Sequence, residues 1–375
     1  MVMKAREKLF SFKRPYDLEA TNDLFVKAMK ENLDYQYHYC LPYKAILDKQ
    51  GFHPSNLKTI DDLAKLPFIP TLYYKHHEIY SMPKKKMVIK ATSSGTSSGT
   101  TSHIGFNFES LLWGWSMLRR VFRYHRIWSL KPTRFIIFGY QPSKKNKRAI
   151  AKTAHGFTFS APAKSKDYAL KVVKGEYQLD LASLKANLIR YAKGKCPVRT
   201  LGFPAYTYFL LKEMQEEGIR LQLPKGSLIT IGGGWKEFYK EQVDKEDFYR
   251  LVKDVLGVDD QHIVEFFGAV EHPILYTDCR YHHFHIPVYS RVIIRDVDTL
   301  EPLEHGQMGL INLLTPMVMS TPVLSVMTDD LGILHDSPCP CGEKSPYLEI
   351  IGRVGVADIK TCAAGAEDIL KEQGA

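Results

Sequence analysis

Residues 92–107 read Thr-Ser-Ser-Gly-Thr-Ser-Ser-Gly-Thr-Thr-Ser-His-Ile-Gly-Phe-Asn. From Thr92 to Ser102 the stretch holds only serine, threonine and glycine, so it offers hydroxyl groups and unobstructed backbone amides without any charge. Residues 87–91 before it predict a short strand, and residues 108–122 after it carry apolar side chains at helical spacing. A turn in this position can point successive N–H groups at an anion. The stretch is therefore either a phosphate-binding loop or a flexible linker, and its own residues fit both.

This stretch matches neither of two common nucleotide-binding motifs. No lysine follows its second glycine, which excludes the GxxxxGK[ST] loop, and its glycines do not fit GxGxxG. Because Ser-Ser-Gly-Thr occurs twice, residues 93–96 and residues 97–100 are both candidates for contact with phosphate.

The composition is that of an ordinary globular protein, with 375 residues, 45% of them hydrophobic and 25% charged. This length allows one large domain or two. No run of eighteen apolar residues occurs, and the N-terminus leads into charged sequence rather than into an apolar signal core. We therefore expect a soluble, cytoplasmic protein without a transmembrane segment.

The formal net charge of +10 includes short basic clusters at 84–86, 144–148 and 193–195. Lysine-rich turns of this kind are common on solvated surfaces, so the charge does not indicate nucleic-acid binding. An anionic substrate or an acidic partner would make use of the same charge. The six cysteines do not resemble a disulfide framework in a chain this long, and metal binding or thiol chemistry is the better interpretation.

Hydrophobic periodicity predicts the order of the elements. Residues 17–50 have helical spacing, and a short helix at 60–66 precedes the turn at 67–70. Beyond the loop, predicted helices at 111–127, 179–196, 206–217 and 238–256 alternate with predicted strands at 134–139, 200–204, 227–234 and 262–268. This alternation predicts an α/β fold with a mostly parallel sheet that binds ligands at the carboxyl ends of its strands. Residues 288–296 and 308–314 lack intervening helices and predict an antiparallel β subdomain.

Five signals follow one another along the chain: the Ser/Thr/Gly loop, Gly232-Gly233-Gly234, Phe267-Gly268-Ala269-Val270-Glu271, Met327-Thr328-Asp329-Asp330-Leu331-Gly332, and Gly352-Arg353. In this order they resemble the adenylate-forming superfamily of acyl-CoA synthetases and luciferases, over roughly residues 90–360. The resemblance favours a phosphate loop over a linker. It also implies a helical leader at 1–90, a nucleotide-binding core at 91–275, a β subdomain at 276–352 and a short C-terminal segment at 353–375.

The resemblance further implies a role for each signal. The loop would hold the β- and γ-phosphates of ATP, with its second half as the favoured contact: Ser97, Ser98, Gly99, Thr100 and Thr101. The turn of Gly232, Gly233 and Gly234 would lie against the adenine. Glu271 would bind Mg²⁺, which prefers one or two carboxylates beside phosphate oxygens. Asp330, with Asp329 as the competing choice, would bind the ribose hydroxyls, whereas a plain turn aspartate is the alternative.

Within that superfamily, Phe68-Ile69-Pro70 and the ending from Gly352 to Cys362 resemble the LuxE family of acyl-protein synthetases. This resemblance implies that a fatty acid is activated as acyl-AMP and then held as a thioester on Cys362, for delivery to an acyl reductase partner. It also implies that the usual C-terminal domain of longer relatives is lacking. Arg353 would offset phosphate charge or form a structural ion pair, and Lys360 would neutralise the leaving pyrophosphate or simply lie on a strand.

Three alternatives to the acyl-carrier interpretation remain, one for Cys362 itself and two for the whole chain. A lone cysteine is commonly an inert buried thiol, although Ala363, Ala364 and Gly365 leave room around this one. The chain could instead be an acyl- or aryl-CoA ligase that releases its product to coenzyme A, or a non-catalytic scaffold that binds a reductase.

A second group of residues has the spacing of a metal site. Cys339 and Cys341 form a Cys-x-Cys pair before a glycine, and Cys279 lies six residues before His285. Three cysteines and one histidine suit a tetrahedral structural zinc ion, and the pattern resembles a site in phenylacetate-CoA-ligase-like relatives. His282 or His283 could replace His285, and reduced thiols in a hairpin are the alternative to a metal.

Overall fold

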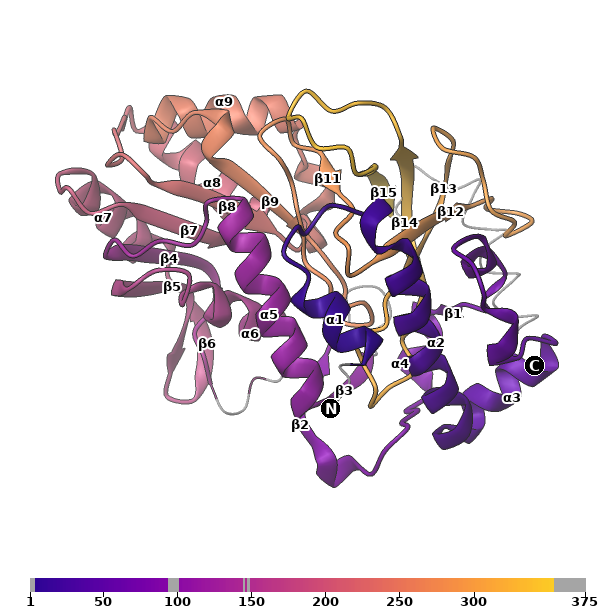
Figure 1. The fold of residues 1–375 in the computed structure, drawn as a ribbon. Coiled ribbons are helices and arrows are strands. Elements are labelled where there is room, and N and C mark those ends of the chain that lie inside the picture. The colour runs from indigo at the N-terminus through magenta and orange to yellow at the C-terminus, as the bar shows by residue number, and fades with distance from the viewer. Residues whose placement is uncertain (1–3, 94–100, 144–145, 147–148, 354–375) are drawn as a thin grey trace.

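The structure is a computed structural model that describes residues 4–93, 101–143, 146 and 149–353. It contains a mostly parallel sheet flanked by helices and a separate antiparallel sheet against which the N-terminal helices pack (Figure 1). This is the fold class that the sequence predicts. No helix among the described residues is both long enough and apolar enough to span a membrane.

The larger sheet has seven strands in the order β10-β9-β8-β7-β4-β5-β6, and its central pairs are parallel. Its strands are β4 (Thr133–Tyr140), β5 (Ala163–Val173), β6 (Glu176–Leu179), β7 (Val198–Gly202), β8 (Leu228–Gly232), β9 (Ile263–Phe267) and β10 (Tyr276–Thr277). The edge pairs β5–β6 and β9–β10 are antiparallel.

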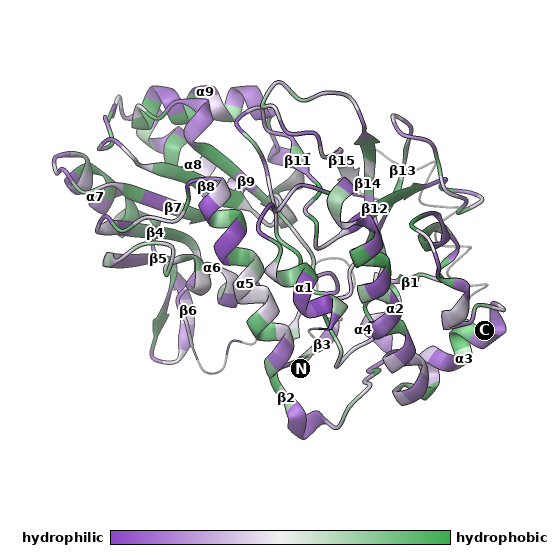
Figure 2. Ribbon diagram, viewed as in Figure 1, coloured by the Kyte–Doolittle hydropathy of each residue, from purple (hydrophilic) through white to green (hydrophobic). Residues whose placement is uncertain are grey.

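Helices cover both faces of this sheet because alternate residues of the strands point to opposite sides. Ile136 and Phe138 of β4 belong to one buried cluster, whereas Phe135 and Ile137 belong to another. The first cluster includes α7 (Leu181–Ala192), α8 (Pro204–Glu216) and α9 (Lys245–Leu256), and the second includes α5 (Phe108–Tyr124) and α6 (Ala149–Phe157). In Figure 2, β8 and β9 are largely hydrophobic, whereas α9 alternates between hydrophobic and hydrophilic residues.

The hairpin of β5 and β6 is not among the predicted elements. Its two-residue turn consists of Lys174 and Gly175, both with positive φ, which matches the right-handed twist of the strands. The edge strand is β6, and only Tyr168 and Ala169 of β5 are buried, so residues 163–173 lack the apolar run that reveals a buried strand.

Two predicted helical segments are shorter than expected. The segment at 238–256 is a 3-10 helix, Lys236–Glu241, followed by α9, because the backbone at Asp244 is extended. The segment at 17–50 is interrupted at Cys40, whose backbone is also extended, and Pro42 lies in the first turn of the next helix. The elements there are a 3-10 turn (Glu19–Thr21), α2 (Asn22–Tyr39) and α3 (Leu41–Lys49).

The second sheet has six strands. Five are antiparallel in the order β11-β15-β14-β13-β12, and β1 adds to β14 in parallel. Their bounds are β1 (Ile69–Pro70), β11 (Phe284–His285), β12 (Arg291–Arg295), β13 (Met308–Leu314), β14 (Ser325–His335) and β15 (Tyr347–Arg353). The antiparallel strands that the sequence predicts at 288–296 and 308–314 are thus present as β12 and β13.

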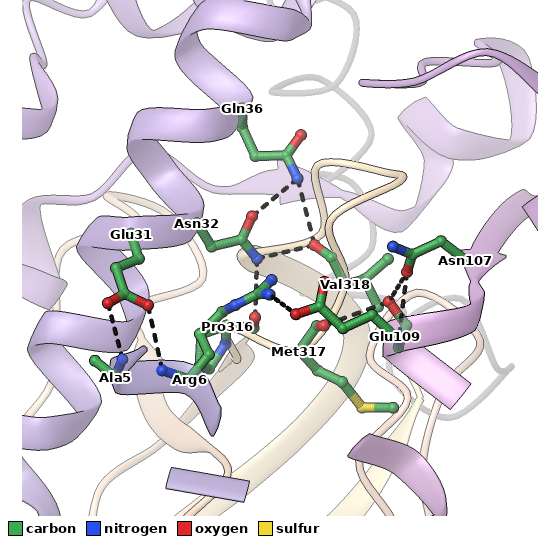
Figure 3. A network of polar contacts seen from close by, with 11 residues as sticks. Ala5, Arg6, Glu31, Asn32, Gln36, Asn107, Glu109, Pro316, Met317 and Val318 are labelled. Atoms are coloured by element: carbon green, nitrogen blue, oxygen red, sulfur yellow. Dashed lines mark hydrogen bonds and ion pairs between the residues drawn. The ribbon is translucent and has the colours of Figure 1, made fainter. Parts of the chain in front are cut away.

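The N-terminal helices share a buried core with this second sheet. Leu9 of α1 (Ala5–Ser11) and Phe25 of α2 belong to the same cluster as Leu313 and Val326. A polar network adds to this packing: Asn32 of α2 donates to the backbone oxygens of Pro316 and Val318 at 3.0 and 2.8 Å (Figure 3).

The first turn of α1 is completed by a side chain of α2. Glu31 accepts the backbone N–H groups of Ala5 and Arg6, and it thereby satisfies donors that a helix N-terminus leaves unpaired (Figure 3). The Arg6 side chain, which is 3% exposed, pairs with Glu109 at 2.7 Å. These contacts connect α1 and α2 to α5, the helix that follows the Ser/Thr/Gly loop.

Candidate active site

The Ser/Thr/Gly loop joins two antiparallel strands, β2 (Met87–Thr92) and β3 (His103–Asn107). Its base is closed by two hydrogen bonds: the Ser93 N–H donates to the Ser102 backbone oxygen, and the Ser102 N–H donates to Ser93 Oγ at 2.9 Å. Thr101 is half-buried. The favoured phosphate contacts Ser97, Ser98, Gly99 and Thr100 lie outside the described residues, as does most of the first half of the repeat.

The glycine turn follows β8 at the carboxyl end of the parallel sheet. A Cβ at Gly232 would lie 2.9 Å from the Phe266 backbone oxygen of β9, so the two strands approach too closely here for a side chain. Gly233 and Gly234 have φ of 85° and 68°, a left-handed conformation that favours glycine. The turn of three glycines therefore presents backbone atoms that carry no side chains, next to the end of β9, the strand that leads to Glu271.

Glu271 is buried, with 4% of its surface exposed, and burial raises the pKa of its carboxyl group. The Ser102 hydroxyl and the charge of Lys75 lower the pKa of Glu271, whereas the negative charge of Asp329 raises it further. These interactions bring together the end of the Ser/Thr/Gly loop, the segment after β9, strand β14 and helix α4 (Thr71–His76). A buried carboxylate of this kind suits a cation, because a charge removed from water needs a partner.

Asp329 and Asp330 of β14 face Arg353 at the end of β15. Asp330 lies opposite Arg353 in the strand register, with Arg353 Nε 3.7 Å from Asp330 Oδ1 and Arg353 Nη2 3.4 Å from Asp329 Oδ2. All three side chains are partly exposed, so this ion pair contributes little to folding stability. Arg353 therefore lies within the candidate site, next to both aspartates that the sequence proposes for the ribose.

Two residues near the site are not among the sequence candidates. Thr71 donates to Asp329 Oδ1 at 2.9 Å, and the charge of Lys75 lowers the pKa of Glu271. Their position depends on the parallel pairing of β1 with β14, which joins segments more than 250 residues apart in the chain. The only local signal is the Pro67–Pro70 turn directly before them, and it does not indicate what they contact. Lys360 and Cys362 lie outside the described residues.

The second group of sequence candidates comes together around one point. The ligand atoms of Cys279, His285, Cys339 and Cys341 all lie within 4.8 Å of one another, and three of these residues are buried. Cys279 Sγ is 3.8 Å from Cys339 Sγ, and His285 Nε2 is 3.2 Å from Cys341 Sγ. This Cys₃His group could hold a metal ion.

Contacts around the group support this fit. His285 Nδ1 lies 2.7 Å from the Ser345 backbone oxygen, which leaves Nε2 to face the thiols, and such a contact is typical of metal-binding histidines. The backbone N–H groups of Tyr281 and Glu343 point at the sulfurs of Cys279 and Cys341. Burial, together with the neighbouring thiols, raises the pKa of Cys279 to about 12, so its thiolate requires a nearby cation.

The other histidines of this segment have different partners. His282 Nδ1 lies 2.8 Å from the Asp278 carboxylate, and the ring of His283 stacks on Tyr347. His283 Nδ1 also lies 3.2 Å from Cys339 Sγ, at the border of the group.

Comparison with known proteins identifies the family to which the sequence is similar. The family described as "Acyl-protein synthetase, LuxE" matches residues 7–371. The chain is 25% identical to the long-chain-fatty-acid–luciferin-component ligase of Aliivibrio fischeri, over 95% of this chain and 91% of the relative. It is 23% identical to the phenylacetate-coenzyme A ligase of Thermus thermophilus, over 87% of this chain and 68% of the relative.

A solved structure shares the fold. The chain superposes on 2-hydroxyisobutyryl-CoA ligase with a TM-score of 0.68 and 14% sequence identity, covering 92% of this chain and 72% of the ligase. The resemblance to adenylate-forming enzymes that the motifs indicate is therefore confirmed at the level of the fold. Because the family match covers nearly the whole chain, the protein belongs to the LuxE family of acyl-protein synthetases.

Proposed function

We propose that this protein activates a long-chain fatty acid with ATP and then carries the acyl group on Cys362 as a thioester. The observation that carries the proposal is the convergence of Glu271, Ser102, Asp329 and Arg353 beside the carboxyl ends of β8 and β9. Relatives named for the ligation of long-chain fatty acids support the choice of acid.

The first step forms acyl-AMP. An oxygen of the fatty-acid carboxylate attacks the α-phosphorus of ATP, the bond to the bridging oxygen breaks, and pyrophosphate leaves with that electron pair. Loop amides between Ser93 and Ser102 would hold the β- and γ-phosphates, and Arg353 would offset charge that develops in the transition state. The glycine turn would admit the adenine, and Asp330, or Asp329 beside it, would accept the ribose hydroxyls.

Glu271 would hold Mg²⁺ at this site. Mg²⁺ supplies charge neutralisation when it is bound with the phosphates, and it favours few carboxylates beside phosphate oxygens. The buried carboxylate, whose pKa is raised because burial disfavours its charge, fits that role.

The second step transfers the acyl group. The Cys362 thiolate attacks the acyl carbon of acyl-AMP, the carbon–oxygen bond breaks, and AMP leaves with the electron pair. Lys360, two residues earlier, would neutralise the pyrophosphate before it departs. The thioester retains enough reactivity for delivery to an acyl reductase, the partner that the family resemblance implies.

Zinc is the metal we propose for the Cys₃His group. The ion would be structural, because four protein ligands complete a tetrahedral site and leave no position open for a substrate. It would join the turn at 279–285 to the loop between β14 and β15, and no reaction step depends on it.

The test is fatty-acid-dependent exchange of pyrophosphate into ATP, followed by labelling with radioactive fatty acid. We expect C362S to retain exchange while losing the label that survives denaturation and is released by hydroxylamine. The control is C196S, since Cys196 is a half-buried thiol at the amino ends of β4 and β7, whereas the candidate site lies at the carboxyl ends of the strands. If C362S still forms the hydroxylamine-sensitive adduct, the carrier assignment is wrong.

The second candidate function is that of an acyl- or aryl-CoA ligase, which the similarity to phenylacetate-coenzyme A ligase favours. This function requires coenzyme A as the acyl acceptor. Continuous pyrophosphate release that depends strictly on added coenzyme A, with no acylated protein, would favour it over the acyl-carrier function.

A further inference from the structure

Helix α4 is held against the candidate site by three contacts. The strand before it, β1, pairs in parallel with β14, with Ile69 opposite Val326 and Pro70 opposite Met327. Thr71, its first residue, donates to Asp329 Oδ1 at 2.9 Å. The buried Tyr74 hydroxyl donates to the Pro322 backbone oxygen at 2.7 Å. The helix therefore has a fixed orientation relative to the site.

Lys75 is four residues after Thr71, so both side chains lie on the same face of α4. That face is turned toward Asp329, and the half-buried Lys75 interacts electrostatically with the buried Glu271. Ser102, at the end of the Ser/Thr/Gly loop, is also beside Glu271. The face of α4 that carries Lys75 is thus the one that Thr71 joins to β14, and the charge of Lys75 acts on the buried carboxylate.

The charges of the site indicate what Lys75 does there. Arg353 lies against Asp329 and Asp330, at the outer end of the site, whereas Glu271 lies inward beside Lys75. A nucleotide polyphosphate is strongly anionic, and lysine is a compact point charge with three rotatable donors that binds phosphate oxygens readily. Arg353 beside the two aspartates and Lys75, whose charge acts on Glu271, together suit a ligand that carries several negative charges.

We propose that Lys75 is a phosphate-binding residue of the ATP site, positioned by Thr71 and the β1–β14 pairing. This inference rests on the proposed function and adds a residue from the N-terminal helices to the nucleotide site. Those helices would then complete the active site in addition to packing against the core.

The experiment measures binding of Mg-ATP and of AMP to the full chain by calorimetry, without fatty acid, for the natural protein, K75M and K75R. We expect K75M to weaken Mg-ATP binding by about 10- to 100-fold, the size of a lost charge-assisted hydrogen bond, while AMP binding changes little. K75R retains the charge and should recover part of the affinity. The matched control is K58M, an exposed lysine of the same N-terminal region, which should bind as the natural protein does.

Three results would overturn the inference. Unchanged Mg-ATP binding by K75M, with normal pyrophosphate exchange in the natural protein, refutes the role of Lys75 and leaves the proposed function intact. A higher KM for fatty acid with unchanged Mg-ATP binding would assign Lys75 to the acyl carboxylate instead. If the natural protein binds no Mg-ATP and exchanges no pyrophosphate, both the proposed function and this inference are wrong. A melting temperature equal to that of the natural protein ensures that K75M is folded.

Discussion

Glu271 combines burial with a negative charge, and this combination has a cost for folding. Burial raises the pKa of its carboxyl group, which means that the folded environment disfavours the carboxylate. The Ser102 hydroxyl and Lys75 offset part of this cost, while Asp329 adds to it. A protein retains such a group when the charge serves a ligand, as perturbed carboxylates at functional sites commonly do.

Replacing Glu271 with glutamine separates the cost of the buried charge for folding from its benefit for ligand binding. The amide is similar in size but uncharged, so we expect E271Q to melt at or above the temperature of the natural protein. Pyrophosphate exchange should fall by at least about 10-fold, since one charged contact is lost in the transition state. E304Q, at an exposed carboxylate, serves as the control for both measurements. Full exchange activity in E271Q would exclude a role for this carboxylate in binding Mg²⁺.

At the scale of elements, helix α2 connects the N-terminal region to the antiparallel sheet. Asn32 and Gln36 lie one turn apart on its buried face, and both donate to backbone oxygens of residues 316–319 (Figure 3). Gln36 also donates to the Asn32 side chain at 3.0 Å. Polar groups buried this way stabilise a unique arrangement because each loses water and needs its partner.

Substituting Asn32 with alanine should therefore destabilise the protein. The change leaves the backbone oxygens of Pro316 and Val318 with fewer donors in a buried site, which costs about 1–3 kcal/mol. Urea unfolding followed by circular dichroism measures the loss. The control K27A, on the exposed face of the same helix, should change stability by less than about 0.5 kcal/mol. Equal stability of N32A and K27A would show that packing alone holds α2 in place.

At the scale of the whole molecule, the Cys₃His group joins chain segments that are distant in the sequence. Cys279 and His285 lie near β11, whereas Cys339 and Cys341 lie in the loop between β14 and β15. Tyr124, at the end of α5, also reaches this region by donating to Glu343 at 2.6 Å. A metal ion here would hold the turn at 279–285 to the loop between β14 and β15, next to the end of α5.

Metal analysis of the purified protein should find about one zinc ion per chain, as one tetrahedral site requires. Removing it with a strong chelator should lower the melting temperature. The stabilisation lost is about 4 kcal/mol when free zinc exceeds its dissociation constant a thousandfold. C339S should show the same loss without chelator, and C196S, whose thiol lies away from the group, should bind zinc normally. If the purified protein contains no metal and chelator does not change its melting temperature, the three cysteines are reduced thiols without a metal.

Much of the fold was predictable because its signals are local. The run at 134–139 and the runs that precede Gly202, Gly232 and Gly268 are short, apolar and bounded by turns, and they became parallel strands. Helix α7 lies within the predicted range 179–196 and begins directly after Asp180, whose side chain accepts the Ser183 N–H. The edge hairpin at 163–179 and the breaks at Cys40 and Asp244 were missed, since they depend on exposure and backbone conformation rather than on periodicity.

The sequence by itself determined the class of fold and the order of the five motifs, because periodicity and turn residues are local properties, and it proposed Cys279, Cys339 and Cys341 with one of three histidines as metal ligands. Only the tertiary structure decided which of these signals lie together. It brought Thr71 within hydrogen-bond distance of Asp329, 258 residues later in the chain, and it turned Lys75 toward Glu271. It also directed His285 toward the thiols and His282 toward Asp278. The physical reason is that the pairing of β1 with β14, and the packing of the turns around Cys279, depend on contacts between distant segments that no local pattern records.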